Sequence, residues 1–238
     1  MKFLKCMLCM SLLTVSSVYA GDAEIKKNFK NAMPSLTLKS IEKSKVAGLY
    51  QVEAGSGEML FTSADGAYFI TGDLYSTLGG KLKNLTEKRR EQARVDDISA
   101  IDDKDKIIFA PKGETKAKIT VFTDIDCGYC RKLHKEVPAL NDMGVEVSYL
   151  AFPRSGIGSD SYHKFVSAWC SDDKKTALTT AKAGQQIPEK NCKNPIAEQY
   201  DLGRKLGVNG TPAIVLEDGR IIPGYMPAAK LGKALGVL

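Results

Sequence analysis

The sequence predicts a small α+β N-terminal domain, a linker helix and a C-terminal α/β domain that carries a helical insertion. Three observations predict this organisation. They are a signal-peptide pattern at the N-terminus, a polar helical pattern between two strand-rich regions, and a Cys-x-x-Cys motif between a β-rich run and a helical pattern in the second region. About 218 residues follow the signal-peptide pattern, which is enough for two modest domains.

Residues 1–20 are predicted to be a cleaved secretory signal peptide. Lys2 and Lys5 form its basic start, residues 7–18 form an apolar core, and Val18-Tyr19-Ala20 has the small-x-small pattern of a cleavage site. The apolar core is short for a membrane span, and no later stretch reaches eighteen consecutive apolar residues. We therefore expect an exported, soluble mature protein, in which disulfides are the usual state of cysteines.

Residues 21–81 are predicted to form the N-terminal domain. Asp22 can cap a helix that runs to about Ala32, and Pro34 prevents its continuation. Short strands are expected at residues 36–38, 48–54, 58–63 and 67–71. A unit of about sixty residues without cysteine has a marginal core, so we expect it to pair with a second copy, for which an exposed edge strand is a natural site.

Residues 82–103 are predicted to be a linker that consists mainly of a helix from Asn84 to about Ile101. This helix is polar, with only a weakly apolar face, and is therefore expected to bridge domains through solvent. Its basic cluster Lys88-Arg89-Arg90 has acidic neighbours, and the formal net charge falls from +6 to +4 without the signal peptide and is spread along the chain. We interpret the cluster as a solvated helix face and expect no nucleic-acid partner.

Residues 104–238 are predicted to form the α/β domain. Its expected strands are residues 107–109, 118–122, 145–152, 213–217 and 220–222. The helical insertion is expected at about 154–206, with helices at 162–169, 174–183 and 195–206, and a last helix at 227–235.

The motif Cys127-Gly128-Tyr129-Cys130 is the strongest candidate site. It follows a strand and precedes a helical pattern that Pro138 kinks or ends, which is the context of a thioredoxin-like redox motif. Cys127 falls in the first helical turn, where unpaired N–H groups and the helix dipole favour a thiolate, while Cys130 lies deeper. We predict that the Cys127 thiolate attacks a substrate disulfide and that the Cys130 thiol resolves the resulting mixed disulfide. Asp126 is expected to be the N-cap, and its charge should oppose the thiolate.

Two alternatives for this motif are a structural zinc site and an inert disulfide. Cys127, Cys130 and His134 could supply three zinc ligands, but neither a second Cys-x-x-Cys motif nor paired histidines supply a fourth. We therefore predict neither a metal nor another cofactor, and we expect His134 to be an exposed helix residue.

The remaining signals are a proline and two further cysteines. Pro212 opens a strand after Gly210-Thr211; in thioredoxin-like proteins such a proline follows a cis peptide bond that faces the Cys-x-x-Cys motif. The four cysteines outside the signal peptide allow three pairings. If the motif must cycle, Cys170 and Cys192 should form a structural disulfide, with a second redox couple as the alternative.

At residues 122–134 and 210–213 the chain resembles the DsbC family of bacterial periplasmic disulfide isomerases, and the order of parts is similar over the mature length. The resemblance implies a thioredoxin domain and a dimerisation domain, arranged as a V-shaped homodimer whose two active sites face an apolar cleft. It implies a periplasmic location and a membrane electron donor of the DsbD type, which keeps the motif reduced.

The expected function is that of a thiol-disulfide oxidoreductase which isomerises or reduces wrong disulfides in misoxidised exported proteins, with associated chaperone activity. Thr211, Pro212, Gly128 and Tyr129 are the expected substrate-binding residues. One alternative is a DsbG-like binding protein, although that group usually has proline at the position of Gly128. Another is a DsbA-like oxidase, which typically differs at Tyr129 and at Thr211 and lacks the N-terminal domain.

Overall fold

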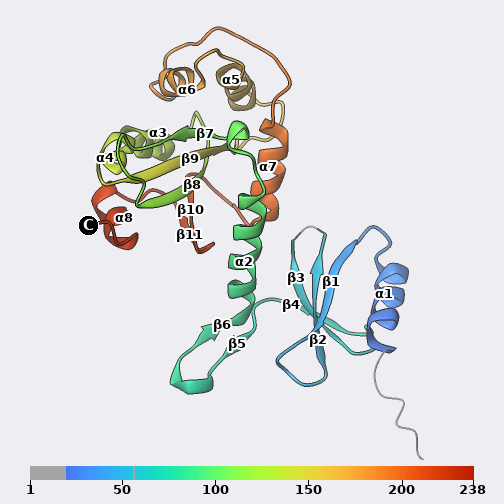
Figure 1. Ribbon diagram of the computed structural model, residues 1–238. Helices are drawn as coiled ribbons and strands as arrows, with labels where there is room; N and C mark the ends of the chain where they lie inside the picture. The colour runs from blue at the N-terminus through green and yellow to red at the C-terminus, as the bar shows by residue number, and fades with distance from the viewer. Residues whose placement is uncertain (1–19, 56) are drawn as a thin grey trace, which may run out of the picture. The chain divides into compact units, whose positions relative to one another are not determined.

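The computed structural model describes residues 20–55 and 57–238, which form two compact units, one that ends at Gly72 and one that spans Asp73–Leu238 (Figure 1). The predicted signal peptide lies outside the described residues, apart from Ala20, which begins the first helix. Within the described part of the chain, no helix is both long enough and apolar enough to cross a membrane.

The first unit packs one helix against an antiparallel sheet. Helix α1 (Ala20–Ala32) is followed by β1 (Leu38–Lys43), β2 (Leu49–Ala54), β3 (Met59–Ser63) and β4 (Phe69–Thr71), which pair in the order β1-β2-β3-β4. Ile25 and Phe29 of the helix are buried against residues of β2 and β3. The strand expected at residues 36–38 is wrong, since β1 begins at Leu38. The polar residues of β1 do not give the alternating pattern of a strand, because an edge strand needs no alternation of buried side chains.

The second unit begins with a hairpin that the sequence pattern did not predict. Strands β5 (Tyr75–Ser76) and β6 (Lys83–Asn84) pair on either side of a 3₁₀ turn, Leu78–Gly80, and α2 (Leu85–Ser99) follows. Asn84 caps α2 by accepting a hydrogen bond from the Glu87 N–H. The helix is less solvated than its polar sequence predicts. Buried Arg94 donates from Nε to the Leu206 carbonyl at 3.1 Å and from Nη1 to the Gly219 carbonyl at 3.0 Å, so α2 is bound to the second unit.

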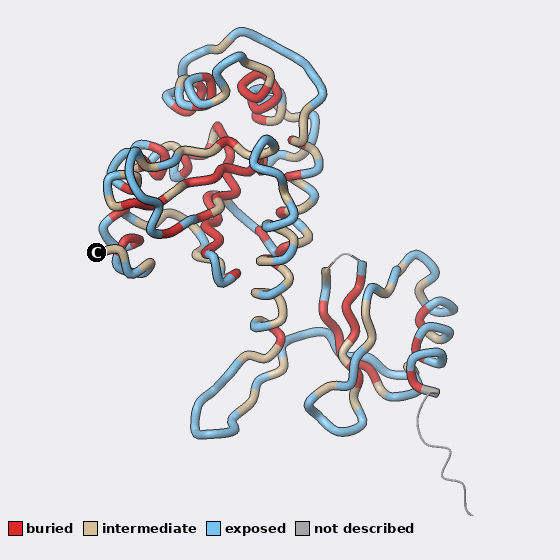
Figure 2. The backbone as a smooth tube through the Cα atoms, viewed as in Figure 1, coloured by how far each residue is buried: buried red, intermediate tan, exposed pale blue. Residues whose placement is uncertain are grey.

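A five-stranded mixed sheet forms the centre of the second unit. After a short 3₁₀ turn (Asp103–Asp105), the strands are β7 (Ile107–Phe109), β8 (Ala117–Thr123), β9 (Val145–Ala151), β10 (Ala213–Leu216) and β11 (Ile221–Pro223). Their order is β11-β10-β8-β9-β7; β8 and β9 are parallel and the other pairs are antiparallel. Side chains alternate along β8, so that Val121 and Phe122 enter separate buried clusters, one on each face. Figure 2 shows the central strands as buried.

Helices cover both faces of this sheet. They are α3 (Gly128–Lys135), α4 (Val137–Asp142), α5 (Asp160–Trp169), α6 (Lys174–Lys182), α7 (Ile196–Lys205) and α8 (Ala228–Ala234). Pro138 lies in the first turn of α4, where a missing N–H does no harm, and the chain bends at Glu136 between α3 and α4. The insertion supplies α5 and α6, which lie together above the sheet in Figure 1, and α6 contacts α3.

Candidate active site

The two motif cysteines lie where β8 gives way to α3. Cys127 has extended backbone angles (φ −79°, ψ 122°) and is itself the N-cap, with α3 beginning at Gly128. Both thiols are reduced and buried: Cys127 is 3% exposed and Cys130 is fully buried. The prediction that Asp126 caps the helix is wrong. Its carboxylate instead forms ion pairs with Arg131 Nη2 at 3.0 Å and Lys164 Nζ at 2.8 Å.

Cys127 faces the loop that precedes β10. Its Sγ donates a hydrogen bond to the Thr211 carbonyl oxygen at 3.2 Å, and the Thr211–Pro212 peptide bond is cis. Burial alone would raise the pKa of Cys127. Hydrogen bonds from Thr211 and from the Cys130 N–H, together with the charge of Arg154, outweigh burial and lower this pKa below its ordinary value. Cys127 therefore forms a thiolate more readily than an unperturbed cysteine does.

Cys130 has the opposite character. Burial raises its pKa above the ordinary value, and this effect exceeds the stabilisation of the thiolate by Lys182 and by the Asp124 N–H, which donates to Cys130 Sγ at 3.4 Å. The motif thus joins a thiol that ionises easily to one that is held protonated in the interior. This asymmetry is what stepwise thiol-disulfide exchange requires.

Asp124 organises the charges beside the motif, and the sequence analysis did not single it out. Its buried carboxylate accepts hydrogen bonds from Ser161 Oγ at 2.6 Å, from Arg154 N at 2.9 Å and from Arg154 Nε at 3.1 Å. Burial raises the pKa of Asp124, but these contacts outweigh burial and keep the pKa below its usual value. A carboxylate right after a strand was the available signal, but Arg154 and Ser161 come from the insertion and carry no motif.

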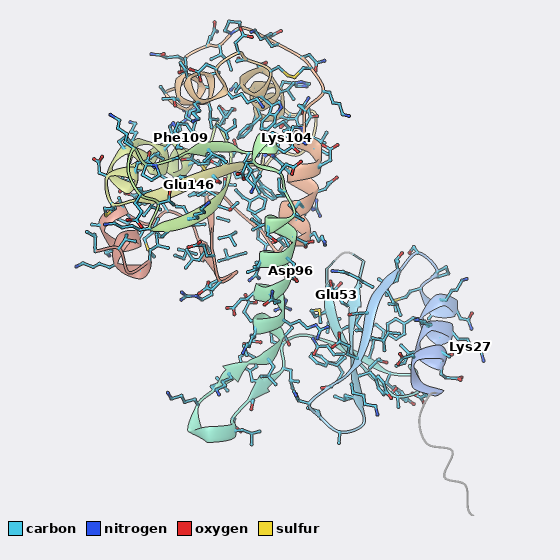
Figure 3. The ribbon with its side chains drawn as sticks, viewed as in Figure 1. Lys27, Glu53, Asp96, Lys104, Phe109 and Glu146 are labelled. Carbon is cyan, nitrogen blue, oxygen red and sulfur yellow. A yellow bond between two sulfur atoms is a disulfide. The ribbon has the colours of Figure 1, made fainter. Side chains whose placement is uncertain are left out.

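His134 is buried, so its expected exposure is wrong. Nδ1 lies 3.1 Å from the Tyr149 hydroxyl and Nε2 lies 3.0 Å from Thr179 Oγ1, while the ring meets Phe109, labelled in Figure 3, edge to face. Burial and the positive charge of Lys182 lower the pKa of His134 to about 4. Because both ring nitrogens are engaged with neighbours on β9 and α6, His134 is not placed to join the two cysteines as a metal ligand.

The predicted substrate-binding residues flank Cys127. Tyr129 is 64% exposed and stacks on Tyr225, with the ring centroids 6.4 Å apart. Gly128 is exposed, and a Cβ placed on it would meet no described atom within 4 Å. Pro212 is buried, and the buried Thr211 hydroxyl lies close to both sulfurs and favours their thiolate forms.

The other two cysteines form a disulfide. Cys170, at the end of α5, is bonded to Cys192 in the segment before α7, with their Cα atoms 5.7 Å apart. The bridge therefore lies within the helical insertion and closes a loop that contains α6.

The mixed sheet, the cis-proline loop and a reduced Cys-x-x-Cys pair at the start of a helix together define a thioredoxin-like thiol-disulfide oxidoreductase. A family model described as a thioredoxin-like domain matches residues 103–237, and one described as the N-terminal domain of disulfide bond isomerase proteins matches residues 16–87. The chain belongs to the DsbC family of thiol:disulfide interchange proteins. The predicted fold class and family are confirmed.

Individual relatives agree over most of their length. The chain is 36% identical to thiol:disulfide interchange protein DsbC of Escherichia coli strain K12 over 94% of this chain and 93% of the relative. It is 40% identical to DsbC of Salmonella typhimurium over 87% of this chain and 84% of the relative. A crystal structure of a disulfide interchange protein from Neisseria gonorrhoeae, 30% identical, matches 57% of this chain and 96% of that chain with a TM-score of 0.52.

Proposed function

We propose that this protein is a disulfide isomerase and reductase in which Cys127 is the nucleophile and Cys130 the resolving thiol. The observation that carries this proposal is the contrast between the two thiols. Cys127 has a lowered pKa and lies beside the exposed residues Gly128 and Tyr129, whereas Cys130 has a raised pKa and no exposed surface. A nucleophile must be ionised and reachable, and a resolving thiol must stay unreactive until a mixed disulfide forms.

The reaction begins when the Cys127 thiolate attacks a wrong disulfide in an exported protein. A mixed disulfide forms and one substrate sulfur leaves. If the freed substrate thiol attacks elsewhere and re-pairs, Cys127 is released unchanged and the substrate is isomerised. If the substrate stalls, Cys130 attacks Cys127, and the substrate leaves reduced.

The substrate strand lies along Thr211 and Pro212 in this proposal. The Thr211 hydroxyl is buried beside Cys127 and favours its thiolate, so the substrate would meet the backbone of Thr211. The ring of Tyr129, stacked on Tyr225, offers an apolar surface on the other side of Cys127, and the absence of a side chain at Gly128 leaves room for the substrate backbone.

Reactivation of scrambled ribonuclease tests the catalytic roles. We expect Cys127→Ser to abolish reactivation, because no nucleophile remains. Cys130→Ser should still attack but should accumulate mixed disulfides, visible on non-reducing gels. Reactivation retained by Cys127→Ser would reject the assignment. An oxidase would instead keep the motif mainly as a disulfide in cells, which rapid alkylation in vivo distinguishes from the dithiol expected here.

The first unit offers a surface for a second copy of the chain. Strand β4 is an edge strand, and Tyr68, Phe69 and Ile70 on or beside it are 78%, 49% and 62% exposed. Such an apolar edge favours pairing with another edge. We expect Ile70→Lys to yield monomers in sedimentation. Val46 is also exposed in this unit, and the control variant Val46→Lys should leave the oligomeric state unchanged.

A homodimer of this kind would place two active sites around one client. Its apolar surfaces would support chaperone activity, which is the main activity in the alternative of a DsbG-like binding protein. Cys127→Ser separates the two activities, because binding of unfolded clients should survive in it.

Residues 1–20 as a cleaved signal peptide would deliver the protein to the periplasm. A membrane electron donor of the DsbD type would return the motif to the dithiol after each reductive cycle.

A further inference from the structure

Lys182 is a buried lysine beside the redox motif that the exchange reaction described above leaves unused. It is the last residue of α6, in the helical insertion, and is 2% exposed. Its Nζ donates to Thr123 Oγ1 at 2.7 Å and to the Asp124 carbonyl oxygen at 3.4 Å, and lies 5.3 Å from the centre of the Tyr149 ring. Burying an ammonium group is costly, so a buried lysine needs a compensating partner.

The residues that hold Lys182 are the same ones that touch Cys130. Asp124 accepts from Lys182 through its carbonyl and donates from its N–H to Cys130 Sγ at 3.4 Å. The Thr123 hydroxyl accepts from Lys182 and also favours the Cys130 thiolate. The end of β8 therefore connects the buried cation to the buried thiol, and each of the two charges favours the other.

We infer that Lys182 is a positioning residue for the resolving step: its ammonium group, held by Thr123 and Asp124, stabilises the Cys130 thiolate and so speeds release of the substrate from Cys127. The inference rests on the proposed roles of the two cysteines. It assigns to the helical insertion a direct part in the chemistry, besides its structural disulfide.

The step involves one exchange of sulfur partners. The Cys130 S–H loses its proton, and the thiolate attacks Cys127 Sγ of the mixed disulfide. The Cys127–Cys130 bond forms as the bond between Cys127 and the substrate sulfur breaks. The substrate sulfur leaves with the electron pair and takes up a proton, so the substrate is reduced and the motif is oxidised. At pH 7, below its pKa of about 8, Lys182 keeps its proton during this step and acts by its charge alone.

The pH dependence of this step can be assigned because few groups around Lys182 titrate between pH 6 and 9. Burial and the charge of Lys182 hold the pKa of His134 at about 4, and burial raises the pKa of Tyr149, so both stay neutral. Asp124 stays ionised because its hydrogen bonds outweigh burial and lower its pKa, and Arg154 stays charged because its hydrogen bond to Asp124 and the nearby negative charges outweigh burial and raise its pKa. Burial lowers the pKa of Lys182 to about 8, so Lys182 changes charge in this range, whereas burial keeps the pKa of Cys130 above its ordinary value.

Reaction with the aromatic disulfide DTNB separates attack from release, because each expels one coloured thiolate. Cys127 expels the first and Cys130, by resolving the mixed disulfide, expels the second. We expect Lys182→Met to slow the second phase about tenfold at pH 7 and to raise its pH midpoint by about one unit, while the first phase changes by less than about threefold. The control Lys175→Met, exposed on the same helix, should match the wild type in both phases.

Lys182→Gln separates charge from hydrogen bonding, since its amide can still donate to Thr123 and Asp124. We expect it to shift the second-phase midpoint as Lys182→Met does, and it carries the test if the methionine variant does not fold. A wild-type midpoint in either folded variant, or equal losses in both phases, would overturn the role of Lys182. A first phase that persists in Cys127→Ser would instead overturn the proposed function.

Discussion

The two cysteine pairs of the second unit have opposite chemistry. Cys127 and Cys130 are reduced, lie at the start of α3 and are surrounded by groups that separate their pKa values. Cys170 and Cys192 are joined, and they tie the end of α5 to the segment before α7. The surroundings of a cysteine pair, rather than the presence of two cysteines, therefore decide whether the pair reacts or only restrains the chain.

The largest expected difference between the pairs is in their reactivity. Iodoacetamide added to the reduced, folded protein should alkylate Cys127 alone, because it is the thiol with a lowered pKa beside exposed residues. Peptide mapping by mass spectrometry should find Cys130 labelled only after unfolding, and Cys170 and Cys192 only after reduction. Alkylation of Cys130 before Cys127 would contradict the proposed order of attack.

Removal of the structural bridge tests the other half of the comparison. The two bridged cysteines are 22 residues apart, and a loop of that size contributes about 3 kcal/mol through the entropy of the unfolded chain. We expect Cys170→Ala/Cys192→Ala to lose about this much unfolding free energy in urea titrations while the DTNB phases of the folded protein keep their wild-type rates. A loss of thiol reactivity in the folded variant would mean that the bridge is part of the redox machinery.

Stability around the reactive pair should depend on pH through His134. Burial and the charge of Lys182 lower its folded-state pKa to about 4, below the usual value near 6.5, so the unfolded chain binds more protons between these values and stability falls as pH falls through this window. Unfolding free energy should drop by about 2 kcal/mol from pH 7 to pH 5. The drop should shrink in His134→Gln and persist in His163→Gln, whose histidine is exposed. An equal drop in both variants would exclude His134 as its source.

The reactive pair could be predicted from the sequence because its signals are local. The strand before the motif, the helix after it and the proline at Pro212 each follow from neighbouring residues. His134 could also have been placed correctly, since Cys130, Leu133, His134 and Val137 have the spacing of one buried helix face. A histidine on such a buried face is a core residue unless a catalytic or metal partner gives it a function.

The charged surroundings could not be predicted in the same way. Lys182 and Arg154 reach the motif only because the insertion folds back over α3 and the end of β8. Both residues are far from the motif in the sequence, and no local pattern predicts the contact. Arg94 similarly looked like one more charge on a polar helix, but it binds two backbone carbonyls of the second unit. The positions of these buried charged side chains are thus known only from the tertiary structure.

The smallest expected effect concerns Asp126, which lies beside Cys127. Its carboxylate is paired with Arg131 and Lys164, and its side chain is 33% exposed, so solvent and two cations weaken its repulsion of the thiolate. Asp126→Asn leaves both cations without this partner, and we expect the pKa of Cys127 to fall by less than about one unit. Absorbance of the thiolate at 240 nm during a pH titration measures the shift. Asp172→Asn, which removes a carboxylate paired with Lys190, is the matched control and should leave the titration unchanged. A rise in the pKa would mean that Asp126 acts on Cys127 mainly by positioning Arg131 and Lys164 beside the thiolate.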